Sequence, residues 1–114
     1  MAWGYHFIID CKECNDTITD SFTILRFLHA VCDTTEMEAH GEPIIEYLLE
    51  GTDNAGYSAF QMITTSNITA HFVDKTKAAY VDVFSCKPFN VKAVEFVVRS
   101  FFDPLTVETK YFER

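Results

Sequence analysis

Apolar and polar residues alternate along several short segments of the chain, which is the period of a β-strand with one buried face. Within residues 67–73, for example, Ile68, Ala70 and Phe72 fall on one face and polar residues occupy the other. Alternation of this kind, together with short apolar runs bounded by turn residues, predicts strands at 4–11, 44–50, 57–64, 67–73, 78–85 and 105–112.

Two other segments place apolar residues three or four positions apart, as in a helix that is packed by one face. Asp20 or Ser21 can cap the first helix, of about three turns. Asn90 can cap the second, and Asp103-Pro104 stops it because proline lacks the amide hydrogen. The two apolar stripes consist of Phe22, Ile24, Leu25, Leu28 and Val31, and of Val91, Val94, Val98 and Phe101.

The order of these segments predicts an α+β fold for a single domain spanning residues 1–114. One strand, a helix, four strands, a helix and a last strand are typical of a two-layer α/β sandwich, a mainly antiparallel sheet with two helices on one face. Residues 33–41 are expected to be irregular, and 51–56 to form a turn. The second face of the sheet is then solvated or buried in a homodimer, and an aromatic content of 15% favours the homodimer.

Composition narrows the range of partners. The net charge of −8 argues against nucleic acid and against an anionic membrane surface, since both need a basic face. A cationic small molecule suits this charge better. No stretch reaches the ~18 apolar residues of a membrane span, and no basic region precedes an apolar run at the N-terminus. We therefore expect a cytoplasmic protein.

The cysteines do not form a recognisable metal motif. Cys11-x-x-Cys14 is half of a zinc site, and no second pair follows it; His6 and Cys32 are the only further ligands nearby. We expect no metal, and free thiols in a reducing compartment.

The strongest functional signal is a set of spacings between Gly56 and Pro88. Ser58 precedes Ser66 by eight positions, and His71 and Cys86 follow Ser66 by five and twenty. The segments Gly56-Tyr57-Ser58-Ala59, Ser66-Asn67-Ile68-Thr69-Ala70-His71 and Asp82-Val83-Phe84-Ser85-Cys86 carry these residues. In this pattern the chain resembles the prokaryotic-type S-adenosylmethionine decarboxylases. The opening Gly4-Tyr5-His6-Phe7, Cys14 and the closing Tyr111-Phe112-Glu113-Arg114 are similar to that family as well.

The resemblance implies a self-cleaving proenzyme of polyamine (spermidine) biosynthesis. The hydroxyl of Ser66 would attack the carbonyl of Thr65, and cleavage between them would leave a pyruvoyl cofactor on residue 66. Ser58 would hydrogen-bond the tetrahedral intermediate, and His71 would be the base of the elimination, a common role for imidazole at neutral pH. The pyruvoyl group acts as an electron sink for the decarboxylation of S-adenosylmethionine. The thiol of Cys86 would then return the proton.

Several residues depart from the pattern of this family. Thr65 and Asn67 stand where the family has glutamate and histidine, and Phe72-Val73-Asp74-Lys75 replaces Thr-Trp-Pro-Glu. In the family, the glutamate of the Thr-Trp-Pro-Glu segment binds ribose. Lys75 cannot accept such hydrogen bonds and would bring a positive charge to a cationic substrate; Asp74 is the candidate to substitute for it.

These departures leave three hypotheses open. The first is the decarboxylase, acting on S-adenosylmethionine, a related cationic amine or another amino acid. The second is a non-cleaving, inactive homologue that serves as a ligand-binding or partner subunit. The third is an interaction domain unrelated to the family. The third would be favoured by a structure in which Ser66, His71 and Cys86 do not share a cleft.

Overall fold

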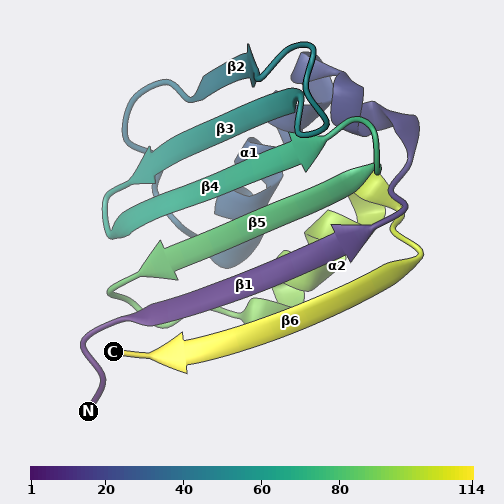
Figure 1. Cartoon of the computed structure of the whole chain (residues 1–114). Coiled ribbons are helices and arrows are strands. Elements are labelled where there is room, and N and C mark those ends of the chain that lie inside the picture. Colours follow the sequence, from purple (N-terminus) through teal and green to yellow (C-terminus); the bar gives the residue numbers. More distant parts are fainter.

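The computed structural model describes all residues, 1–114, and contains one antiparallel sheet of six strands (Figure 1). The strand order is β2-β3-β4-β5-β1-β6, so that the first strand of the chain lies between the last two. The strands are β1 (Tyr5–Lys12), β2 (Ile44–Leu48), β3 (Gly56–Ile63), β4 (Ser66–Val73), β5 (Ala78–Ser85) and β6 (Thr106–Glu113). All predicted strands are present, with ends that lie within two residues of the predicted ones, and β5 matches its prediction at both ends.

Helices α1 (Ser21–Thr35) and α2 (Val91–Phe102) cover the same face of the sheet (Figure 1). The predicted caps are confirmed: Asp20 accepts a hydrogen bond from the N–H of Phe22, and Asn90 accepts two, from Lys92 and Ala93. The core fills the space between helices and sheet. Its largest fully buried side chains are those of Phe27, Phe72 and Phe102. The α+β sandwich is therefore confirmed.

The first helix differs from its prediction in two respects. It continues to Thr35, whose hydroxyl bonds the carbonyl of Val31, and it ends where Glu36 adopts a left-handed conformation (φ 59°). Phe22 does not belong to the buried stripe and is 71% exposed. Residues two apart lie on nearly opposite sides of a helix, so Phe22 cannot share the buried face of Ile24.

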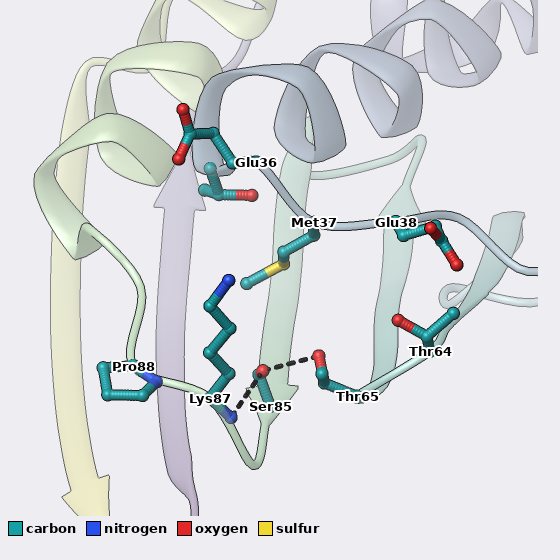
Figure 2. Close-up of a pocket in the computed structure, with 9 residues that line it drawn as sticks. Glu36, Met37, Glu38, Thr64, Thr65, Ser85, Lys87 and Pro88 are labelled. Atoms are coloured by element: carbon teal, nitrogen blue, oxygen red, sulfur yellow. Dashed lines mark hydrogen bonds between the residues drawn. The ribbon is translucent and has the colours of Figure 1, made fainter.

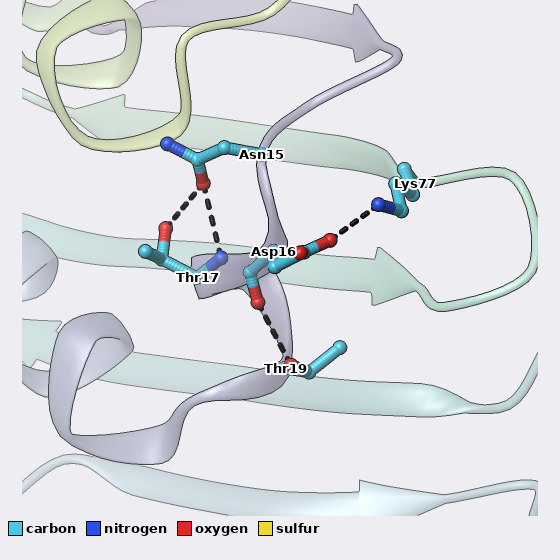
Figure 3. Close-up of polar contacts among 5 residues, drawn as sticks. All are labelled: Asn15, Asp16, Thr17, Thr19 and Lys77. Carbon is cyan, nitrogen blue, oxygen red and sulfur yellow. Dashed lines mark hydrogen bonds and ion pairs between the residues drawn. The ribbon is translucent and has the colours of Figure 1, made fainter.

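A short 3-10 helix, η1 (Asp16–Thr19), joins β1 to α1 (Figure 3). The side chain of Asn15 caps it by accepting a hydrogen bond from the N–H of Thr17, at 3.0 Å. Lys77 pairs with Asp16 and so links this helix to the turn between β4 and β5. The connection thereby ties the N-terminal strand to the centre of the sheet.

The cysteine pair lies at the end of β1 and is buried. A hydrogen bond with Cys14, together with burial, raises the pKa of the Cys11 thiol far above its usual value, and the same bond lowers the pKa of Cys14. Cys32 is buried too, whereas Cys86 is exposed. No group of three or more His, Cys, Asp or Glu side chains is placed to hold a metal ion, and no helix is long and apolar enough to cross a membrane.

The face of the sheet opposite the helices carries both polar and apolar side chains. At one end, His6 contacts the rings of Phe84 and Phe112, with centroids 6.0 and 6.4 Å apart, and Trp3 contacts Phe84. Met62 is exposed on the same face, next to Asn67 in the register of β3 and β4. This uncovered face thus offers apolar surface that nothing in the single chain covers.

Candidate functional site

Ser66, the predicted reactive serine, is the first residue of β4 and follows a two-residue hairpin turn. Ile63 and Ser66 face each other across the turn, which consists of Thr64 and Thr65. Ser66 also pairs with Ser85, the last residue of β5. The predicted scissile bond, Thr65–Ser66, therefore lies at the exit of a tight turn, beside the end of a second strand.

The carbonyl that Ser66 would attack is held by the backbone of the neighbouring strand. The N–H of Cys86 donates a hydrogen bond to the carbonyl oxygen of Thr65, at 3.0 Å. A donor at this position polarises the carbonyl and lies where negative charge would develop during attack on its carbon. The structure thus places the backbone of Cys86 beside the predicted scissile bond.

Hydroxyl and amide groups surround this bond. The hydroxyl of Thr65 lies 2.7 Å from that of Ser85, which is buried and also accepts a hydrogen bond of 3.1 Å from the N–H of Lys87. The side-chain amide of Asn67 donates to Oγ of Ser66, at 2.9 Å. Asn67, a departure from the family pattern, therefore orients the Ser66 hydroxyl.

A cavity of about 260 Å³ opens beside the turn (Figure 2). The side chain of Lys87 extends along it toward Met37, above the hydrogen-bonded pair of Thr65 and Ser85. The cavity is lined by Thr35, Glu36, Met37, Glu38, Thr64, Thr65, Ser85, Lys87 and Pro88. The turn is thus accessible to a small molecule from the helix side.

Ser58 and His71 form a second pair. They face each other in the register of β3 and β4, and Oγ of Ser58 lies 2.7 Å from Nδ1 of His71. The other ring nitrogen of His71, Nε2, lies 3.0 Å from the backbone carbonyl oxygen of Asn54. The imidazole is therefore held at both nitrogens.

Gly56 permits the close strand contact behind this pair. A Cβ atom there would lie 1.8 Å from the carbonyl oxygen of Phe72, closer than any real Cβ contact. The first glycine of the motif is thus needed because the backbones of β3 and β4 approach each other at this point.

The two pairs do not meet within one chain. Ser66 and His71 are five residues apart on the same strand, which separates them by about 16 Å. Strand alternation also places His71 on the uncovered face, whereas the buried Ile68, Ala70 and Phe72 face the helices. One chain therefore does not provide a single cleft for Ser66, His71 and Cys86.

The candidate substrate residues already have partners. The hydroxyl of Tyr47 donates to Oδ2 of Asp74 at 2.7 Å, and this hydrogen bond raises the pKa of Tyr47. Lys75 forms an ion pair of 2.8 Å with Asp53, so its positive charge is offset locally.

Ser85 and Asn54 are among the residues of these networks that were not predicted. Ser85 was signalled by its place beside Cys86 in the motif. Nothing in the sequence predicted the role of Asn54, because its contact with His71 uses a backbone carbonyl, which every residue possesses.

An antiparallel sheet covered on one face by two helices, with a serine at the exit of a central hairpin, defines the class: a two-layer α+β sandwich with a hairpin site. The family model described as S-adenosylmethionine decarboxylase matches residues 5–114, and the chain belongs to this family. The unrelated interaction domain is thereby excluded.

Among solved structures, the chain is similar to the adenosylmethionine decarboxylase from Aquifex aeolicus VF5. The TM-score is 0.83 at 18% sequence identity, over 99% of this chain and 91% of that one. This likeness confirms the fold. No curated protein matches the chain in sequence.

Proposed function

We propose that this protein is a pyruvoyl-dependent S-adenosylmethionine decarboxylase of polyamine (spermidine) biosynthesis, made as a proenzyme that cleaves itself between Thr65 and Ser66. The observation that carries the proposal is the hydrogen bond from the N–H of Cys86 to the carbonyl oxygen of Thr65. It supplies the donor that an acyl shift at this bond requires.

The processing step follows from the groups around the turn. Oγ of Ser66 attacks the carbonyl carbon of Thr65, the peptide C–N bond breaks, and an ester replaces the amide. The Cys86 N–H stabilises the oxyanion that forms on the way. Elimination then removes the Cα proton of residue 66, breaks its Cβ–O bond and releases the new carboxylate of Thr65. Water replaces the nitrogen of the dehydroalanine that remains, and ammonia leaves. The pyruvoyl group left on residue 66 would supply an electron sink for decarboxylation.

The surroundings of Ser66 suit a pyruvoyl group, because a cavity and a candidate proton donor lie nearby. The cavity of about 260 Å³ reaches Thr65 and Ser85, the neighbours of Ser66 and Cys86 in the chain, and Cys86 is exposed. The thiol of Cys86 then serves as the acid that returns a proton to the product carbon. A free thiol in this role calls for a reducing compartment, and the cytoplasm provides one.

The separation of the two pairs supports a homodimer. If two chains pack their uncovered faces about a two-fold axis near the middle of β4, the His71 end of one strand lies over the Ser66 end of the other. Ser58 and His71 of one copy would then act on Ser66 of the second. The apolar surface around Phe84, Phe112 and Met62 is what such packing would bury.

The charges of the site suit a cationic substrate. Lys75 does not oppose a sulfonium ligand with a free charge, because Asp53 pairs with it. Asp74, presented together with Tyr47, is our candidate for the ribose hydroxyls.

Mass spectrometry of the purified chain tests the cleavage. We expect two fragments in place of the 13.1 kDa species, with a pyruvoyl mass on residue 66, and no cleavage in Ser66→Ala. An intact wild-type chain after long incubation would contradict the proposal and favour the non-cleaving homologue.

Release of labelled carbon dioxide tests the substrate. S-adenosylmethionine is expected to support it in the cleaved protein. Release from ornithine or arginine alone would assign the chain to decarboxylation of another amino acid.

A further inference from the structure

The hydrogen bonds of His71 determine which of its nitrogens carries the proton. Nε2 lies 3.0 Å from the backbone carbonyl oxygen of Asn54. A carbonyl oxygen can only accept, so Nε2 must donate. In the neutral ring Nδ1 is then the unprotonated nitrogen, and it accepts a hydrogen bond from the hydroxyl of Ser58 at 2.7 Å.

This arrangement leaves His71 without a free basic atom. Its only lone pair points at Ser58, and a proton from any other group can reach Nδ1 only by way of that hydroxyl. The single proton of Ser58 is also engaged, so Ser58 cannot donate to an oxyanion while the ring is neutral. The separate roles assigned to these two residues by the family resemblance are therefore not available in this state.

We propose that Ser58 and His71 act as one proton relay, with the carbonyl of Asn54 as the positioning group that fixes the tautomer. This inference rests on the proposed function. In the elimination, the proton leaves Cα of residue 66 for Oγ of Ser58 as the Ser58 hydroxyl proton passes to Nδ1 of His71. The Cβ–O ester bond breaks in the same step, so that a carboxylate leaves as an imidazolium forms and the charges balance.

The loop that carries Asn54 is fixed on both sides. The N–H of Asp74 donates to the carbonyl of Ala55 at 3.0 Å, which joins the loop to the end of β4. Lys75 and Asp53 add an ion pair of 2.8 Å, with both side chains largely exposed. Lys75 thus stabilises the loop that orients His71.

Nuclear magnetic resonance of the ¹⁵N-histidine-labelled full chain tests the tautomer without any need for activity. Long-range ¹H–¹⁵N correlations are expected to show His71 protonated at Nε2 and bare at Nδ1. The Ser66→Ala chain keeps the uncleaved state, and His71→Asn assigns the signal. A ring protonated at Nδ1 would overturn the inference, whether or not the chain cleaves.

Cleavage kinetics test the relay. Ser58→Ala and His71→Ala are each expected to slow cleavage by about 100-fold or more, and the double variant no further, because each breaks the same path. Ser58→Thr, which keeps a hydroxyl, should restore most of the rate. If the double variant slows cleavage by the product of the two single effects, the two residues act separately, and the relay is refuted.

A pair of matched lysine variants tests the loop. Lys75→Gln is expected to shift the His71 tautomer equilibrium by about two- to fivefold, the range of an exposed ion pair. Lys77→Gln removes a comparable exposed ion pair with Asp16 on the same turn and should leave His71 unchanged. Equal effects of the two would rule out the positioning role of Lys75.

Discussion

The N–H of Cys86 donates to the carbonyl oxygen of Thr65, the atom on which negative charge would form in the proposed self-cleavage. The donor belongs to the backbone, while the residue itself is exposed, so that its thiol remains available for a separate role. One residue at the end of β5 can therefore serve two steps through two different groups.

This division predicts different effects for two substitutions of Cys86. Cys86→Ala keeps the N–H, so self-cleavage should continue while decarboxylation falls by at least about 100-fold. Cys86→Pro removes the donor and should slow self-cleavage by about 100-fold or more. Mass spectrometry follows the first step and carbon dioxide release the second. Loss of cleavage in a folded Cys86→Ala chain would show that the thiol, rather than the N–H, carries this step.

Ser85 is predicted to support the turn through its hydroxyl. Ser85→Ala removes the partner of the Thr65 hydroxyl and of the Lys87 N–H. It should lower the free energy of unfolding by about 2 kcal/mol, roughly 1 kcal/mol for each of these hydrogen bonds. Urea denaturation measures it. Thr65→Val breaks only the first contact and is expected to cost less; a larger loss for Thr65→Val would place the support elsewhere.

Complementation tests the homodimer. Ser66→Ala and His71→Ala chains are each expected to remain intact alone over the time in which the wild-type chain cleaves. Mixed and refolded together, they should yield dimers in which the His71→Ala chain is cleaved by its partner and the Ser66→Ala chain is not. Mass spectrometry separates the two chains. Cleavage of His71→Ala alone, or of neither chain in a proven mixed dimer, would refute the shared site.

Gly56 is predicted to tolerate no side chain. Gly56→Ala places Cβ 1.8 Å from backbone, which only strand movement can relieve, and should cost about 3 kcal/mol of unfolding free energy. Gly4→Ala is the matched control, since its Cβ meets mainly the movable ring of Phe84 at 3.1 Å. Thermal unfolding compares them, and equal losses would contradict the close strand contact.

The stability that Tyr47 contributes is expected to fall as the pH rises. Its pKa is raised by the hydrogen bond to Asp74, so the stabilisation is complete below the ordinary tyrosine pKa of about 10 and is lost as pH rises through the higher folded value. The stability difference between wild type and Tyr47→Phe should therefore shrink in alkali. Ultraviolet titration is expected to show Asp74→Asn lowering the Tyr47 pKa, and an unchanged value would contradict this cause.

The faces of the strands and helices were predictable because side-chain period is a local property. The alternation of Ile68, Ala70 and Phe72 identified the buried face of β4, and the helix caps were found from Asp20 and Asn90. Even the pairing of Ser58 with His71 follows once the turn at Thr64-Thr65 is located, since the register of a hairpin is set by its turn.

The contacts that complete the site depend on how neighbouring strands and a loop meet in the folded chain. The register of β4 against β5 puts the Cys86 N–H on the Thr65 carbonyl, and the fold of a loop brings the Asn54 carbonyl to His71. Both contacts use backbone groups that all residues share, so they cannot be predicted from the residue types. Spacing in the chain therefore identified the four candidate residues. Only the strand register showed that they form two pairs at opposite ends of β4. The pairs stay apart because residues of one extended strand cannot fold back on each other.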